Sequence, residues 1–196
     1  MKYRTILIQG ALDIEIQYLI DNLENKENLI ISGYEFFIGY INNFKIIISK
    51  TLIGVVNSTI STTIGILKFN PNIVINQGIA GSHKNNIHIG DIIIGEKCCN
   101  INAYSMPSKG KNEGSNPFEW KPNKRAEEIQ FGNLSEDMES IGTYTVYDRF
   151  NIPCVGIRII SNNEITNEIL DKEQAVILQK LLTNFLNDKN NLSILL

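Results

Sequence analysis

A glycine-rich turn at the end of an apolar run is the segment of this sequence best suited to ligand chemistry. Residues 72–76 are β-branched and apolar at their centre, and they lead into Gly78, Ile79, Ala80 and Gly81. Glycines at the end of a strand allow backbone N–H groups to approach a ligand closely. Because open α/β sheets bind small molecules at their strand ends, the segment predicts such a site. By itself it indicates only an α/β ligand-binding domain, and a tight strand exit would use the same residues.

An acid and an amide stand at comparable places elsewhere in the chain. Glu15 follows an apolar run, near the expected N-terminal end of a helix, where a carboxylate is favoured in its ionised form. Asn162 follows another apolar run, and its side chain can both donate and accept hydrogen bonds. Each has a simpler explanation: a solvated helix glutamate for Glu15, and a strand-to-loop turn for Asn162.

Two further acids, Asp137 and Glu139, flank Met138 where a helix is expected to begin. A single carboxylate can accept hydrogen bonds from two neighbouring hydroxyl groups. The same residues also suit a helix start capped by Ser135, with acids in the first turn. The two interpretations are compatible.

Composition excludes several classes of protein. The 196 residues are 43% hydrophobic, which predicts one globular domain over residues 1–196 with an irregular segment at about 105–136. The net charge of −3 and the lack of a Lys/Arg stripe argue against nucleic acid. Two histidines with no cysteine at ligand spacing make a metal site improbable, and no apolar run is long enough for a membrane helix. Three cysteines and a start unlike a signal peptide indicate a cytoplasmic protein.

Strand and helix patterns alternate along the chain and predict an α/β fold of three αβα layers with a mixed, mostly parallel central sheet. Strands are expected over 5–9, 71–82, 89–95 and 152–161, a hairpin over 35–48, and helices over 13–25, 55–68, 138–150 and 172–187. In the second helix, one apolar face is expected to carry Val56, Ile60, Ile64 and Leu67.

Four segments of the chain resemble segments of the purine nucleoside phosphorylase superfamily and occur in the same order as in that family. The branch that the chain resembles most is the 5'-methylthioadenosine/S-adenosylhomocysteine nucleosidases. They are residues 8–15, 71–94, 137–139 and 156–162. The resemblance implies a nucleoside phosphorylase-like fold and hydrolysis of a purine nucleoside, as in methionine salvage. It also implies no cofactor, a small-molecule substrate and a homodimer in which the partner subunit closes the 5' side of the pocket.

The resemblance also implies roles for the four residues of the acidic segments. Glu15 matches the residue that orients and deprotonates the attacking water. Asp137, Met138 and Glu139 resemble the family's Glu-Met-Glu, in which the methionine packs under the sugar and the second acid takes the ribose hydroxyls.

At the base end, the resemblance implies that Ile79, Ala80 and Gly81 give backbone contacts to the base or sugar. Asn162 stands where adenine-specific nucleosidases carry an aspartate that donates a proton toward purine N7. An asparagine cannot supply that proton, and related enzymes that prefer 6-oxopurines carry asparagine here. The preference between adenine and a 6-oxopurine is therefore left open.

Water is favoured over phosphate as the attacking group. Phosphorylases of the superfamily hold phosphate with arginines, whereas the turns at residues 10–13 and 51–54 contain none. A phosphate dianion needs cations or an anion-binding nest. A phosphorylase is accordingly the weaker alternative.

One departure from the family falls between Trp120 and Asp137, where relatives carry more chain, including an aromatic segment that sandwiches the base. Either Phe118 and Trp120 build the base pocket here, or the site is incomplete. A noncatalytic nucleoside-binding relative is the alternative that follows.

Overall fold

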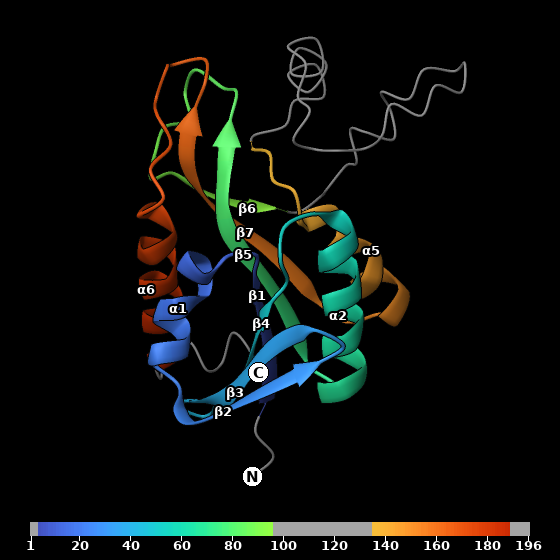
Figure 1. Ribbon diagram of the computed structural model, residues 1–196. Helices are drawn as coiled ribbons and strands as arrows, with labels where there is room; N and C mark the ends of the chain where they lie inside the picture. The colour runs from blue at the N-terminus through green and yellow to red at the C-terminus, as the bar shows by residue number, and fades with distance from the viewer. Residues whose placement is uncertain (1–3, 96–134, 189–196) are drawn as a thin grey trace, which may run out of the picture.

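The computed structural model describes residues 4–95 and 135–188, which form helical layers on both faces of one sheet (Figure 1). Within these residues seven strands pair in the order β2-β3-β4-β1-β5-β7-β6. They are β1 (Arg4–Gly10), β2 (Glu24–Ile31), β3 (Tyr34–Ile41), β4 (Phe44–Lys50), β5 (Ile73–Ser82), β6 (Ile92–Gly95) and β7 (Cys154–Asn163). The four central strands β4, β1, β5 and β7 are parallel, while β2, β3 and β6 add antiparallel pairings. The predicted αβα fold with a mixed sheet is confirmed.

Two pairs of helices cover the sheet. Helices α1 (Asp13–Asp21) and α6 (Gln174–Asn187) lie on one face, and α2 (Val55–Phe69) and α5 (Ser140–Phe150) on the other (Figure 1). Successive residues of a strand point to opposite faces, so the centre of β1 serves both layers. Ile6 and Ile8 pack in the core beneath α1 and α6, and Leu7 packs in the core beneath α2 and α5.

Two expected element boundaries are wrong by three residues or more, and one strand was not expected. The first helix ends at Asp21 rather than Asn25, and the following residues form the unpredicted strand β2. Strand β6 begins at Ile92 rather than Ile89, and it is an antiparallel edge strand with Ile94 65% exposed. An edge strand has one neighbour and one open side, so its apolar residues need not be buried.

The outer face of α2 carries three of the four apolar residues expected to share one face, Val56, Ile60 and Leu67, whereas Ile64 packs against the core. Val56 and Leu67 are 71% and 69% exposed, whereas Ser61 and Gly65 are buried against the sheet. A Cβ on Gly65 would lie 2.8 Å from Leu7 Cδ2, so the helix sits too close to the sheet for larger side chains. Apolar spacing located the helix but not the face that it buries.

The start of α5 is organised by Asp137 rather than by the expected Ser135. Asp137 Oδ1 accepts the backbone N–H groups of Glu139 at 2.8 Å and Ser140 at 2.7 Å. The irregular segment expected at about 105–136 lies outside the described residues except for 135 and 136, as do Phe118 and Trp120. The single domain over 1–196 therefore stays a prediction. Among the described residues, no helix is long and apolar enough to cross a bilayer.

Candidate active site

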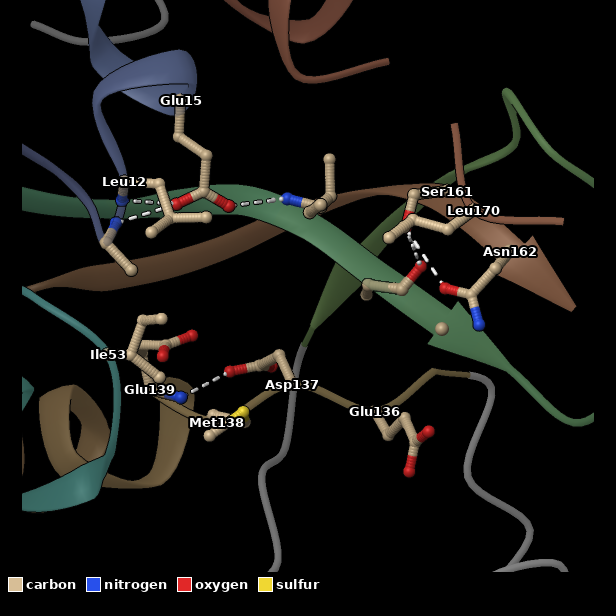
Figure 2. Close-up of a pocket in the computed structure, with 14 residues that line it drawn as sticks. Leu12, Glu15, Ile53, Glu136, Asp137, Met138, Glu139, Ser161, Asn162 and Leu170 are labelled. Carbon is tan, nitrogen blue, oxygen red and sulfur yellow. Dashed lines mark hydrogen bonds between the residues drawn. The ribbon is translucent and has the colours of Figure 1, made fainter. Parts of the chain in front are cut away.

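Chain segments far apart in the sequence meet at a pocket of about 250 Å³ beside the carboxyl end of β5 (Figure 2). This volume lies just below the usual range for small-molecule sites, roughly 300–1,000 Å³. Among the residues that the structure describes, its lining includes all of those predicted from the sequence to catalyse or bind. The full lining is Ala11, Leu12, Glu15, Ile53, Ile79, Ala80, Gly81, Glu136, Asp137, Met138, Glu139, Ser161, Asn162 and Leu170. The structure thus brings together the predicted residues, whose roles stay predictions.

Glu15 is held in the pocket by backbone donors from two elements. Its Oε2 accepts N–H groups of Ala11 at 2.7 Å and Leu12 at 3.0 Å, and its Oε1 accepts that of Ile79 at 3.0 Å. Three donors suit a carboxylate, which only accepts hydrogen bonds when ionised. Gly78 makes room for the group, because a Cβ there would lie 2.5 Å from Glu15 Oε1. Glu15 is 5% exposed, so it is not a solvated helix residue.

Glu139 lies at the same end of the pocket as Glu15 (Figure 2). Its Oε1 accepts the backbone N–H of Gly54 at 3.0 Å. Burial and the nearby charges of Asp137 and Glu15 raise the pKa of Glu139 to about 7, despite the opposing effects of Gly54 and Arg158. A carboxyl group with this pKa changes charge near neutral pH, which makes its hydrogen bonding to a ligand pH-dependent.

Asp137 forms a buried ion pair with Arg158 on β7. Arg158 Nη2 lies 3.2 Å from Asp137 Oδ1 and also donates to Ser140 Oγ at 2.9 Å and to Asn76 Oδ1. Burial tends to raise the pKa of Asp137, but Arg158 and the Ser140 hydrogen bonds outweigh it and lower the pKa to about 2. The charge of Asp137 is therefore directed into the protein, and Glu139 is the member of the pair that is better placed to meet a ligand.

Asn162 lies at the opposite end of the pocket from Glu15 and Glu139 (Figure 2). Ser161 Oγ donates a hydrogen bond to Asn162 Oδ1 at 3.1 Å and lies 3.2 Å from the carbonyl of Ala80. The amide oxygen of Asn162 faces the Ser161 hydroxyl, and Figure 2 shows the amide nitrogen on the side away from Ser161. A donor is thus presented at this end of the pocket.

Sequence reasoning missed two polar residues of this region, Arg158 and Glu136. Arg158 is 4% exposed inside the apolar run of β7, and a single charge in such a run is a signal that it has a buried partner. Glu136 lines the pocket directly before the predicted acidic segment, and nothing in its spacing distinguishes it from a loop residue. Among the described residues, no group of three or more His, Cys, Asp or Glu side chains is arranged to hold a metal ion.

The family model described as the phosphorylase superfamily matches residues 5–129 of this chain. The chain belongs to the phosphorylase superfamily. Among curated members, the 5'-methylthioadenosine/S-adenosylhomocysteine nucleosidase of Exiguobacterium sp. is 39% identical over 87 residues, which are 44% of this chain and 37% of the relative. That of Bacillus cereus is 28% identical over 80% of this chain and 85% of its own length.

Solved structures of superfamily members share the same fold. The structure of the corresponding nucleosidase from Colwellia psychrerythraea, in complex with adenine, superposes with a TM-score of 0.77 at 20% identity. The match covers 94% of this chain and 95% of the other. The match to the first curated relatives, by contrast, spans about two fifths of the length of each relative.

Proposed function

We propose that this superfamily member hydrolyses the N-glycosidic bond of a purine nucleoside, such as 5'-methylthioadenosine or S-adenosylhomocysteine. The observation that carries the proposal is the convergence of Glu15, Glu139 and Asn162 on one pocket. The substrate class is taken from the curated relatives, which are named 5'-methylthioadenosine/S-adenosylhomocysteine nucleosidases. A role in methionine salvage follows from that substrate class, and the cytoplasmic location stays a proposal based on cysteine content.

The reaction divides between the two ends of the pocket. Glu15 accepts a proton from a bound water, whose oxygen forms a bond to C1' of the ribose. The bond from C1' to the purine nitrogen breaks, its electron pair leaves with the base, and a proton from solvent restores the neutral purine. Glu139 accepts hydrogen bonds from the ribose hydroxyls, and Asn162 donates one to the base as negative charge develops there.

The charge of the pocket supports water rather than phosphate. Four acids line it, Glu15, Glu136, Asp137 and Glu139, and none of the described lining residues is Lys or Arg. Arg158 is close, but its guanidinium is engaged by Asp137, Ser140 and Asn76. A phosphate dianion would meet acids without compensating cations.

A base-release assay tests the proposal. The full chain is incubated with methylthioadenosine, S-adenosylhomocysteine, adenosine and inosine, with and without phosphate, and free base is measured by chromatography. Hydrolysis is supported if base is released without phosphate and this release disappears in Glu15→Gln. The control variant Glu27→Gln, at an exposed residue of β2, is expected to release base as the wild type does. Release that requires phosphate would identify a phosphorylase, and calorimetric binding of nucleoside without release would identify a binding protein.

We also propose that the protein is a homodimer through the outer face of α2. Val56, Ile60 and Leu67 are large apolar side chains that are 71%, 42% and 69% exposed on this one helix. Clustered exposed apolar residues mark association surfaces, and a two-fold pair of identical helices buries such a face against itself. Light scattering is expected to give twice the chain mass. Val56→Glu with Leu67→Glu places like charges on the proposed interface and is expected to reduce it to one chain mass, whereas Ile169→Glu, an exposed position outside α2, is expected to leave it unchanged. A monomeric wild-type protein would contradict this.

A further inference from the structure

Two polar side chains face the same small space at the Asn162 end of the pocket. A Cβ built on Gly81 would lie 3.2 Å from Glu136 Oε1 and 3.4 Å from both Nδ2 and Oδ1 of Asn162. Because Gly81 has no side chain, the space between the carboxylate and the amide is not filled by this residue. Figure 2 shows Glu136 and Asn162 toward the same end of the pocket, away from Glu15. Gly81, Glu136 and Asn162 also line the same pocket, so the edge of a planar ligand that packs against Gly81 would lie near both polar side chains.

Glu136 is fixed in this position by its backbone and by its side chain. Its N–H donates to the carbonyl of Gly81 at 2.9 Å, and its carbonyl accepts the Gly81 N–H at 3.2 Å. Its Oε1 lies 3.0 Å from Nε2 of His83, and the side chains are 23% and 9% exposed respectively. A carboxylate held from two directions loses less conformational entropy on meeting a ligand than a mobile surface glutamate does.

We propose that Glu136 is a specificity-determining residue that accepts a hydrogen bond from an N–H group on the six-membered ring of the purine. The proposal rests on the proposed function, because it takes Asn162 as the residue facing the base. An ionised carboxylate is only an acceptor, whereas the Asn162 amide can donate to a ring nitrogen or a carbonyl oxygen. The pair therefore selects bases that combine an acceptor with an adjacent N–H donor. Purines with a ring N–H or an exocyclic amine have this combination.

Matched substrates that differ only in that N–H group test the assignment. Inosine is compared with 1-methylinosine, and adenosine with N6,N6-dimethyladenosine, in the wild-type full chain and in Glu136→Gln. We expect the wild type to prefer at least one parent over its methylated partner by roughly tenfold to a hundredfold in kcat/KM, the range for a hydrogen bond to a charged group. In Glu136→Gln that preference is expected to fall at least fivefold, mostly through KM.

The glutamine variant separates hydrogen bonding from steric exclusion. Glutamine has nearly the same shape as glutamate, so a preference caused only by crowding of the methyl group would be the same in both proteins. An unchanged preference, or no preference in the wild type, overturns the assignment. Glu136→Leu, which removes the acceptor at similar size, is expected to abolish the preference. Glu173→Gln, an exposed residue before α6, is the matched control and is expected to behave as wild type.

Binding of free bases distinguishes failure of this proposal from failure of the proposed hydrolysis. Calorimetry with hypoxanthine, 1-methylhypoxanthine, adenine and N6,N6-dimethyladenine requires no catalysis. If the chain releases no base from any nucleoside but binds a parent base in a Glu136-dependent way, hydrolysis is contradicted and the role of Glu136 stands. If nucleosides are hydrolysed without any Glu136 dependence, the hydrolysis stands and the role of Glu136 is contradicted. If the chain neither binds a base nor releases one, both proposals are overturned.

Discussion

Arg158 on β7 forms an ion pair of 3.2 Å with Asp137, a pocket-lining residue in the segment before α5. The pair joins two parts of the site, because Asp137 also accepts the N–H groups of Glu139 and Ser140. The position of Glu139 is thus set by a residue of the central sheet, through an acid that itself faces inward. A chain of buried polar groups continues below, since Arg158 contacts Asn76, and Asn76 donates to Thr143 on α5.

Replacing Arg158 by Met is expected to destabilise the protein strongly. The change leaves Asp137 buried without its cation, which typically costs about 3–5 kcal/mol. The free energy of unfolding, measured by urea denaturation at pH 7, is expected to fall by that amount. The double variant Arg158→Met with Asp137→Asn retains a hydrogen-bond acceptor for the N–H groups at the start of α5 without the charge, and it is expected to recover most of the loss. Equal stability of the single and double variants would contradict the argument.

Acid stability gives an independent measure of the same ion pair. The folded-state pKa of Asp137 is about 2, below its ordinary value of 3.8. A lowered carboxyl pKa contributes stability that is fully present above about pH 4 and is lost as the pH falls toward 2. Wild-type unfolding is therefore expected to become more favourable across this window. In Asp137→Asn the free energy of unfolding should change less over the same pH range. If it changes with pH equally in the two proteins, the ion pair does not contribute as described.

Nucleoside binding is expected to weaken as the pH falls through about 7. Glu139 has a pKa of about 7, and only its ionised form accepts hydrogen bonds from both ribose hydroxyls. Between pH 8 and pH 6 the Kd for a nonreacting nucleoside analogue, measured by calorimetry, should rise roughly tenfold. Glu139→Gln is expected to bind more weakly with a flat profile. If the variant keeps the wild-type pH dependence, another group is responsible.

Glu15→Gln is expected to lower kcat by roughly a hundredfold to ten-thousandfold, the range for loss of a general base. The amide keeps one acceptor oxygen, but its NH₂ group must face a backbone donor at either Ala11 and Leu12 or Ile79. We therefore expect a stability loss of about 1–2 kcal/mol from the mismatched hydrogen bonds. Circular dichroism at the assay temperature checks that the variant is folded. A kcat close to wild type in a folded variant would exclude Glu15 as the base.

Much of the fold could be predicted because the central strands are largely apolar and are separated by helical patterns. The strand β2 could not be predicted from its residues, since most of Glu24–Ile31 is exposed and polar. It forms by pairing along β3, so its conformation depends on a neighbour rather than on its own pattern. The buried face of α2 was predicted wrongly for a related reason. Gly65 lies so close to Leu7 that no larger side chain fits between helix and sheet there, and this distance depends on the assembled sheet rather than on the helix sequence.

The site was predictable to the extent that its residues lie at the ends of elements. Glu15 and Glu139 lie at the starts of helices and Asn162 lies near the end of a strand, and the hydrophobic pattern indicates the positions of these elements. Their convergence therefore follows from the topology of a parallel sheet. Glu136 and Arg158 depend on partners far away in the sequence, His83 and Asp137 respectively. The raised pKa of Glu139 also arises only when Asp137 and Glu15 are brought next to it.

Asn162→Asp is expected to increase hydrolysis of adenine nucleosides, roughly tenfold at pH 6. An aspartic acid can transfer a proton to the leaving purine, which the asparagine amide cannot do, and a general acid contributes roughly a hundredfold or more when well placed. Glu136 and Asn162 lie close to the same point above Gly81, so the charge of Glu136 would raise the pKa of the introduced aspartate and keep part of it protonated. The Ser161 hydroxyl still has an oxygen to which it can donate. The rate gain is expected to decline as the pH rises from 6 to 8, and in the Glu136→Gln background it should decline at a lower pH. A gain that does not depend on pH would show that the aspartate acts through binding rather than through proton transfer.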